Sequence, residues 1–317
     1  MSKKQFDVIG KSKIWFLIPA IIIVAGIVVM LMLGLNTGIE FEGGTIVNVT
    51  FNKDLTDAEY NTELSKTVKI IESNGLVVAQ TQKSYDTGTS ILVRYENKGT
   101  EDEMIALNET VKSTLTESYR AQIDDEAVGI TIETISNTAS QELLLRATIA
   151  IVAASIVMLV YIGFRFDWKS GLAAIIALIV NVLFMVSCTA IFQIQVNTSF
   201  IAAIITIIAY SINSTIIIFD RVREYKKKAV HLEKVTKKDI ANDAIKSSFT
   251  RTIYATFTTL ATITVLAVIA LPSIREFALP IIFGLLAGSF SSICIAPALW
   301  VVLSGGKLND KVKTESK

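Results

Sequence analysis

Long runs of apolar residues without a charged side chain alternate with charged stretches along this chain of 317 residues. The first run, Ile14 to Leu33, is twenty residues long and holds no Asp, Glu, Lys or Arg. At about 1.5 Å per helical residue it reaches about 30 Å, the thickness of the hydrocarbon core of a bilayer. The run predicts a membrane-spanning helix rather than a signal peptide, because no convincing small-residue cleavage site follows it.

Five further apolar runs predict five more membrane-spanning helices, which makes six in all. They cover Leu144–Ile162, Leu172–Phe192, Phe200–Phe219, Thr252–Leu271 and Phe277–Leu303. Only residues 163–171 separate the second run from the third, a gap that is typical of a tight hairpin between antiparallel helices.

Basic residues flank these runs on alternate sides, which predicts how the chain crosses the membrane. Cytoplasmic flanks are rich in Lys and Arg. With the N-terminus in the cytoplasm, the N-terminal lysines, a basic loop at 220–250 and the lysines of the tail all fall on that side. The prediction is a multi-pass protein with both termini in the cytoplasm. Its parts are a cytoplasmic N-terminus 1–13, a first helix 14–35, an extracytoplasmic domain 36–140, helices two to six within 141–303, and a cytoplasmic tail 304–317.

The segment 36–140 is too long for a simple loop and is predicted to fold. It holds eighteen Asp and Glu residues against eight Lys and Arg residues. Thr56 with Glu59, and Thr100 with Glu103, have the spacing of helix capping boxes. Alternating apolar positions predict strands. The predicted elements are, in order, Gly44–Phe51, helix Thr56–Ser73, strands Leu76–Lys83 and Ser90–Tyr95 joined by a turn at Asp86–Gly88, helix Thr100–Tyr119, and strand Val128–Ile135. The fold class is therefore a membrane α-helical bundle of six transmembrane helices with one extracytoplasmic α+β ferredoxin-like domain of order β-α-β-β-α-β.

Composition narrows the possible functions. The net charge of +1 does not favour nucleic acid as a partner. The two cysteines, Cys188 and Cys294, lie in apolar runs and are predicted to be free and buried. The single histidine, His231, lies in the basic loop, so a His/Cys metal site and a His-based catalytic triad are not expected. We predict a protein that is not an enzyme and has no cofactor and no metal.

One motif follows the first predicted helix directly. Its sequence is Gly-Ile-Glu-Phe-Glu-Gly-Gly-Thr, with Gly38, Glu40, Phe41, Gly43, Gly44 and Thr45 as the marked positions. It resembles the Gly-Ile-Asp-Phe-x-Gly-Gly-Thr motif of the SecD/SecF family of protein-export membrane proteins. Further stretches resemble the same family in order along the chain: Tyr161–Gly171, Tyr210–Glu224, Arg251-Thr252 and Phe277–Pro297.

The resemblance implies a function that hydropathy cannot supply. Members of the SecF type pair with SecD, belong to the resistance–nodulation–division (RND) superfamily, and associate with the SecY channel complex in the bacterial inner membrane. The pair is thought to promote export of the translocating preprotein, with energy from the proton motive force or a sodium gradient. The partners implied for this chain are thus SecD, the SecY channel complex, the translocating preprotein and the lipid membrane.

The resemblance also implies where ion coupling would occur, and this chain departs from the family there. The family usually has His-Asp in its third helix and Asn-Asp in its fourth, where this chain has Val180-Asn181 and Asn213-Ser214. Arg251 matches the family's arginine at the start of the fifth helix. The candidates for an ion pathway are Asn181, Asn213, Ser214, Thr215 and Arg251. The family match at the end of the fourth helix, Asp220, Arg221 and Arg223, is expected to form a salt bridge at the helix end.

Three explanations of the missing acids stay open. SecD could carry the coupling acid, the polar oxygens could bind sodium, or the chain could be an uncoupled paralogue.

Gly284, Gly288 and Ser292, spaced by four residues, predict close helix packing, and the threonines of the fifth helix predict helix–helix hydrogen bonds. An exporter of small molecules or lipids of the same superfamily is the main alternative function.

Overall fold

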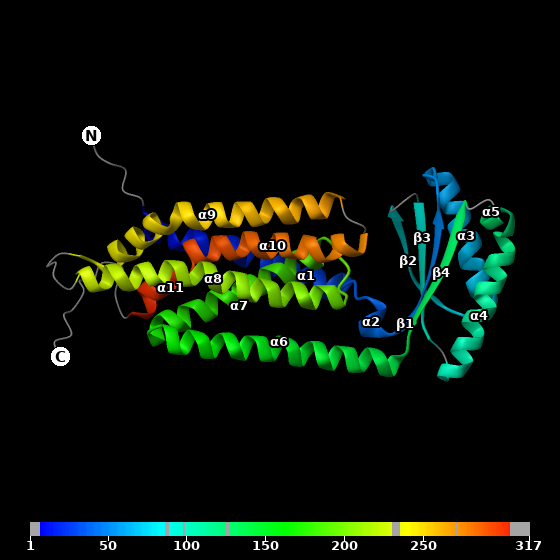
Figure 1. Ribbon diagram of the computed structural model, residues 1–317, viewed down its shortest axis with the longest axis horizontal. Coiled ribbons are helices and arrows are strands. Elements are labelled where there is room, and N and C mark those ends of the chain that lie inside the picture. Colours follow the sequence, from blue (N-terminus) through cyan, green and yellow to red (C-terminus); the bar gives the residue numbers. More distant parts are fainter. Residues whose placement is uncertain are drawn as a thin grey trace. The chain divides into compact units, whose positions relative to one another are not determined.

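The computed structural model describes residues 7–85, 89–97, 99–124, 127–229, 235–269 and 272–304 (Figure 1). The chain divides into two units. The smaller unit consists chiefly of Thr37–Thr148, and the larger unit consists of the helices before and after that segment.

The smaller unit is a four-stranded antiparallel sheet with helices on one face (Figure 1). The strand order is β2-β3-β1-β4, with β1 in the middle between β3 and β4. The elements are α2 (Ile39–Glu42), β1 (Gly44–Phe51), α3 (Asp57–Ser73), β2 (Val78–Tyr85), β3 (Thr89–Tyr95), α4 (Glu101–Ser118), α5 (Arg120–Asp124) and β4 (Val128–Ile135). The predicted order of strands and main helices is confirmed. The short helices α2 and α5 were not predicted, and the predicted turn at residues 86–88 lies outside the described residues.

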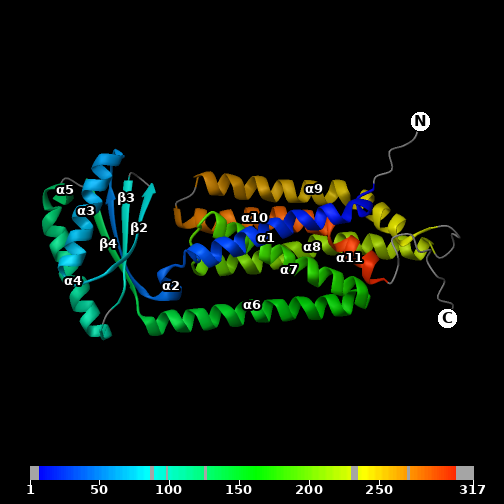
Figure 2. The same ribbon diagram turned by 180° about the vertical axis from the view of Figure 1, so that it is seen from behind.

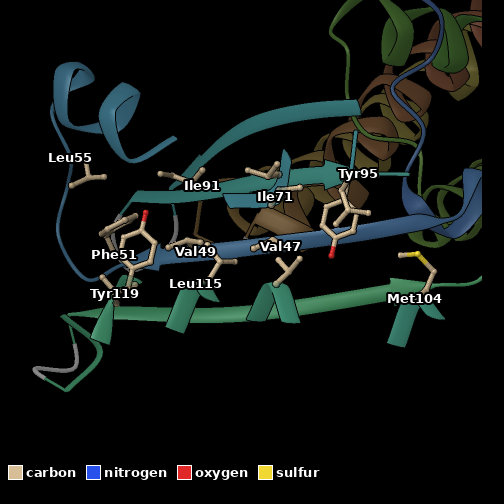
Figure 3. Close-up of a cluster of buried hydrophobic side chains, with 14 residues drawn as sticks. Val47, Val49, Phe51, Leu55, Ile71, Ile91, Tyr95, Met104, Leu115 and Tyr119 are labelled. Atoms are coloured by element: carbon tan, nitrogen blue, oxygen red, sulfur yellow. The ribbon is translucent and has the colours of Figure 1, made fainter. Parts of the chain in front are cut away.

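The core of this unit lies between the sheet and helices α3 and α4 (Figure 3). Val47, Val49 and Phe51 are buried because alternate residues of β1 point to the same face of the sheet. They meet Ile71 of α3 and Leu115 of α4, which are fully buried. Apolar side chains recur at every second residue of the strand and with the helical period along α3 and α4. Both sets therefore point into one continuous apolar layer between the sheet and the helices.

Both predicted capping boxes are present in the structure. The Thr56 hydroxyl accepts a hydrogen bond from the backbone N–H of Glu59, and the Glu59 carboxylate accepts one from the backbone N–H of Thr56. Thr100 and Glu103 form the same pair at the start of α4. These reciprocal bonds satisfy N–H groups that a helix start leaves without a partner, which is why both helices begin where the sequence predicts.

The larger unit contains the helices α1 (Ser12–Leu33), α6 (Asn137–Arg165), α7 (Trp168–Ile191), α8 (Thr198–Ala229), α9 (Lys237–Ile269), α10 (Pro272–Cys294) and α11 (Ala296–Leu303), and α6 links it to the smaller unit. Within the described residues, six helical segments are long and apolar enough to cross a membrane, and α10 with α11 counts as one of them. Helix α1 packs alongside α7, and α8 packs against α9 (Figure 2). Helix α6 is unburied throughout its apolar stretch and meets the bundle near its C-terminal end, where Ile162 is buried.

The structure corrects two expectations. Most of the segment 220–250, predicted to be a basic loop, is helical, because α8 continues to Ala229 and α9 already begins at Lys237. Charged residues that extend a membrane helix beyond the bilayer look like a loop in a hydropathy pattern. The sixth apolar run is also not one continuous helix. It breaks at Ile295, and Pro297 lies in the first turn of the helix that follows.

The start of α9 holds the N-terminal segment of the chain. Lys238 Nζ lies 2.6 Å from the Asp7 carboxylate, and Asn242 accepts hydrogen bonds from the backbone N–H groups of Val8 and Ile9. Burial raises the pKa of Asp7, but the hydrogen bonds from Lys238, Gly10 and Asn242 outweigh it, and the net pKa is lowered. The segment before α1 is therefore attached to the start of α9, which lies within the segment 220–250 that was predicted to be a loop.

The capping box of α3 gives a pH-dependent prediction. The pKa of Glu59 is lowered from 4.5 to about 2, first because the backbone N–H of Thr56 donates to it, then because of the Thr56 hydroxyl and Lys53. Since the folded-state pKa lies below the ordinary value, the ionised carboxylate stabilises the helix start above about pH 4.5, and this contribution fades as the pH falls toward 2. Carboxyl chemical shifts of the full-length chain should give a midpoint near 2 for Glu59. In Thr56→Ala the midpoint should move toward 4.5, and a wild-type midpoint already near 4.5 would contradict the assignment.

Candidate functional site

The family-like motif forms a compact turn between α1 and the sheet. Gly38 precedes α2, and its carbonyl accepts a hydrogen bond from the backbone N–H of Phe41 at 3.1 Å. Gly43 has a φ of 72°, and a Cβ atom there would lie 2.3 Å from the Asn137 side chain. Gly44 has a φ of 126°, with the Tyr95 carbonyl 3.0 Å from the place of a Cβ atom. Both glycines are therefore required by backbone conformation and by space.

Arg94 of β3 holds this turn in place. Its guanidinium donates to the carbonyl of Thr37 at 2.6 Å and to the carboxylate of Glu42 at 2.7 Å. A weaker contact reaches the Gly43 carbonyl at 3.3 Å. One buried carboxylate oxygen of Glu40 has no hydrogen-bond partner within the described part of the chain. The sequence analysis missed Arg94, although an arginine within the otherwise apolar run of β3 is a usable signal.

Thr45, the last residue of the motif, is the centre of a buried polar network. Its hydroxyl donates to the Asn97 side chain at 2.9 Å and lies 3.0 Å from the Thr134 hydroxyl. The amide of Asn108 donates to both threonine hydroxyls, and its oxygen accepts from the Tyr95 hydroxyl at 2.6 Å. Burial raises the pKa of Tyr95 to about 12, so this hydroxyl stays protonated and acts as a donor. The motif thus ties three strands to α4 through hydrogen bonds.

A second polar cluster lies inside the helical unit, where α7, α8 and α10 meet. Asn181 of α7 is only 1% exposed, and its amide contacts the Ser211 hydroxyl of α8. With the amide orientation that the surrounding groups favour, its oxygen also accepts from Ser291 of α10 at 3.0 Å, and its nitrogen donates to the Ala287 carbonyl at 3.1 Å. We name Asn181, Ser211 and Ser291 the polar cluster. Ser211 and Ser291 were not among the predicted site residues.

Small residues allow the helices around this cluster to approach closely. A Cβ atom at Gly26 of α1 would lie 2.3 Å from Ser187 of α7. A Cβ atom at Gly284 of α10 would lie 2.4 Å from Ile207 of α8, and one at Gly288 would lie 3.5 Å from Ser211. The prediction of close packing is therefore confirmed at Gly284, whereas Gly288 leaves space for a Cβ atom at an ordinary contact distance. Ser292 is fully buried, and its hydroxyl donates to a carbonyl of its own helix.

The predicted ion-pathway residues do not converge on one place. Asn181 is in the polar cluster, whereas the Ser214 and Thr215 hydroxyls donate to carbonyls one turn earlier in α8, at 3.5 and 3.0 Å. Asn213 and Arg251 are exposed on the outside of α8 and α9. Among the described residues, no group of three or more His, Cys, Asp or Glu gathers in a way that could hold a metal ion.

The hydroxyls of α9 give a mixed result for the predicted helix–helix hydrogen bonds. Thr259 lies 3.4 Å from the Tyr210 hydroxyl of α8, which is an interhelical contact of the predicted kind. The hydroxyls of Ser248, Thr252 and Thr256 are buried without a hydrogen-bond partner among the described residues. Thr258 and Thr262 bond to carbonyls of their own helix instead. The predicted interhelical hydrogen bond is therefore observed at Thr259.

The salt bridge expected at the end of α8 exists, but with an unexpected partner. Asp220 pairs with Arg165 at the end of α6, 2.8 Å away, and Arg221 pairs with Glu224. Arg223 lies near Trp300, beside a small pocket. Both members of the Arg165–Asp220 pair are about 40% exposed, so it is worth at most about 1 kcal/mol. Its effect is to attach the turn after α6 to α8.

The network around Thr45 gives a stability prediction. Thr45→Val keeps the shape but removes a hydroxyl that three side chains use, so Asn97, Asn108 and Thr134 each lose one hydrogen-bond partner. We expect the smaller unit to lose about 1–3 kcal/mol, measured in the full-length chain by hydrogen exchange of the β1 and β3 amides. Thr50→Val is the matched control on the other face of β1, where Thr50 is half-buried. Equal effects of the two substitutions would contradict a special role for Thr45.

Comparison with known proteins identifies the family. The family model described as "Protein export membrane protein SecD/SecF, C-terminal" matches residues 108–306. The protein translocase subunit SecF of Sebaldella termitidis is 29% identical over 96% of this chain and 94% of its own length. The protein translocase subunit SecDF of Bacillus subtilis is 33% identical over 96% of this chain, which spans only 39% of that relative.

A solved structure is similar over the same range. The crystal structure of SecDF, a translocon-associated membrane protein from Thermus thermophilus, matches 96% of this chain with a TM-score of 0.77 and 25% identity. This chain covers 39% of that protein. The motif at 38–45, the six apolar helices and these matches agree with one another, and the chain is a multi-pass membrane protein of the SecD/SecF family.

Proposed function

We propose that this protein is an accessory subunit of the Sec protein translocase, which acts with SecD at the SecY channel complex to promote export of a translocating preprotein. The observation that carries the proposal is the likeness to SecF over nearly the full length of both chains. The likeness to single-chain SecDF proteins supports the partnership with SecD, because this chain corresponds to only part of those longer proteins.

The proposed topology has both termini in the cytoplasm and the unit at 37–148 on the outer side of the membrane. The distribution of Lys and Arg supports this orientation. We assign the outer unit to the ferredoxin-like fold. The β-α-β-β-α-β order and the strand order β2-β3-β1-β4 support that assignment. The proposed action of this unit is mechanical rather than enzymatic, since its motif residues are engaged in structural hydrogen bonds.

The outer face of α8 supports contact with a second membrane subunit. Ala202, Thr206, Ala209 and Asn213 are exposed in this chain and follow one another at intervals of three or four residues, so they form one stripe. We name it the α8 stripe. Small and polar residues are typical of helix–helix interfaces in membranes, where they allow close approach and hydrogen bonding. An exposed Asn side chain is unfavourable against lipid, and a partner helix removes that cost.

We further propose that SecD supplies the acid for ion coupling. The buried polar residues that the structure describes within the membrane-spanning helices are Asn, Ser and Thr, none of which changes charge in the relevant range. Arg251 is exposed on α9, where it can pair with a carboxylate of another chain. In this proposal Arg251 takes part in ion coupling, whereas in an uncoupled paralogue it would not. The two explanations differ only in this role.

The proposed export role is tested at the α8 stripe. Ala209→Trp places a large side chain where SecD should pack, without disturbing the core of this chain, because Ala209 is exposed. In cells depleted of the native protein, this variant should fail to co-purify SecD and should leave precursor processing slow in a pulse-chase experiment. Ile179→Trp, at an exposed position of α7, is the matched control and should restore both. Unchanged export on depletion, with no second copy of the gene, would overturn the proposed function.

The role of Arg251 is tested through the gradient. Arg251→Ala should keep basal export but lose its stimulation by the proton motive force or by sodium, measured with inverted membrane vesicles in the presence and absence of an ionophore. Lys246→Ala removes another exposed positive charge of α9 and should keep the stimulation. If both variants respond to the ionophore like the wild type, coupling through Arg251 is wrong and the uncoupled paralogue is favoured.

A further inference from the structure

A cavity of about 360 Å³ lies inside the helical unit, between α1, α7 and α10. Ile18 and Pro19 line it from α1, Phe184 from α7, and Ala287 and Phe290 from α10. Its lining contains no charged side chain, and its polar members are Asn181 and Ser291 of the polar cluster. For comparison, an apolar cavity of about 150 Å³ is large enough to stay dry and bind benzene.

The cavity has an exposed mouth and a buried floor. Ile18 and Leu286 at the mouth are 41% and 46% exposed, so the cavity opens sideways from the bundle. Pro19, Ala287 and Ser291 form part of the floor and are buried. Asn181 and Ser291 are already hydrogen-bonded within the polar cluster, so the floor offers no unpaired polar group that would hold water. An apolar cavity with satisfied walls favours an apolar occupant.

The depth of the cavity in the membrane restricts that occupant further. Pro19 lies five residues after the start of the uncharged run at Ile14 and fourteen before its end at Leu33. These separations correspond to about 8 and 21 Å along a helix, so the cavity lies inside a hydrocarbon core of about 30 Å. Asn181, on the cavity wall, lies nearer the middle of its span, thirteen residues after Trp168 and ten before Ile191. Lipid headgroups do not reach this depth, but acyl chains surround the mouth.

We propose that this cavity is a binding site for one acyl chain of a membrane phospholipid, inserted sideways between Ile18 and Leu286. The chain fills space that the helices leave open and covers the floor around Asn181. Because no Lys, Arg or other headgroup ligand lines the cavity, binding depends on the acyl chain and not on the headgroup. The inference concerns a structural lipid and does not depend on the export function.

The site has a consequence for the polar cluster. An acyl chain against Ala287 and Ser291 keeps water away from Asn181 on the side that faces α1. Hydrogen bonds in such a dry environment are stronger than in water, because nothing competes for the donors and acceptors. The lipid therefore helps to hold α10 against α7 and α8 at mid-membrane depth.

The test uses the full-length chain in liposomes that contain a phospholipid with a photoactivatable diazirine near the middle of one acyl chain. After irradiation, labelled residues are mapped by mass spectrometry. Lipids that merely surround the protein label exposed residues, whereas an inserted chain also labels the buried floor at Pro19, Ala287 or Ser291. We expect labelling of the floor, to the same extent with phosphatidylethanolamine and with phosphatidylglycerol as the labelled lipid.

Three variants make the test decisive. Ala287→Phe fills the cavity from its floor, and Ile18→Trp closes its mouth from an exposed position that tolerates a larger side chain. Both should lose the floor label while the exposed helix faces stay labelled, and Leu183→Phe, on an exposed part of α7 outside the cavity, should keep it. If Ala287→Phe does not fold, the floor label in Ile18→Trp is sufficient to test the proposal. An unlabelled floor in the wild type, equal floor labelling in all variants, or loss of the label when SecD is added would overturn the proposal.

Discussion

Helix α10 lies so close to α8 that a Cβ atom at Gly284 would come within 2.4 Å of the Ile207 side chain. Lipid provides no hydrophobic force that would bring helices together, so their association depends on packing of this kind and on hydrogen bonds between them. The approach at Gly284 and Gly288 brings Ser291 and Ser211 to either side of Asn181. A side chain at Gly284 would force α8 and α10 apart, which would weaken the hydrogen bonds from Asn181 to these two helices. The polar cluster and the cavity beside it lie where these helices approach one another.

The motif at 38–45 depends on glycine for its close packing in the smaller unit, as the contact between α8 and α10 does in the bundle. Two glycines in backbone conformations that other residues rarely adopt form the turn, and the Arg94 guanidinium binds its carbonyl and carboxylate groups. Thr45 then joins the strands to α4. The motif therefore defines how the chain enters the sheet. One buried carboxylate oxygen of Glu40 has no hydrogen-bond partner among the residues that the structure describes.

The features that the sequence predicted well are those set by neighbouring residues. Thr56 with Glu59, and the alternation along β1, involve residues close in the chain, so pattern alone was sufficient. The partner of Asp220 is Arg165, 55 residues away, and that of Thr37 is Arg94, 57 residues away, so neither could be read from local spacing. The helical end of α8 was taken for a loop because charged residues resemble solvent-exposed coil, although the Glu224–Lys228 pair has helical spacing. The candidate site was predicted at Asn181 but not at Ser211 or Ser291, since their convergence depends on how three helices cross.

Helix α6 begins at Asn137, directly after β4 ends at Ile135, and runs without interruption to Arg165. Its 29 residues make a rod about 43 Å long, with its far end fastened by buried Ile162 and by the Arg165–Asp220 pair. A continuous helix resists bending far more than a loop of the same length. Helix α6 therefore gives the chain between β4 and the turn after Arg165 a fixed length, which a loop of the same number of residues would not have.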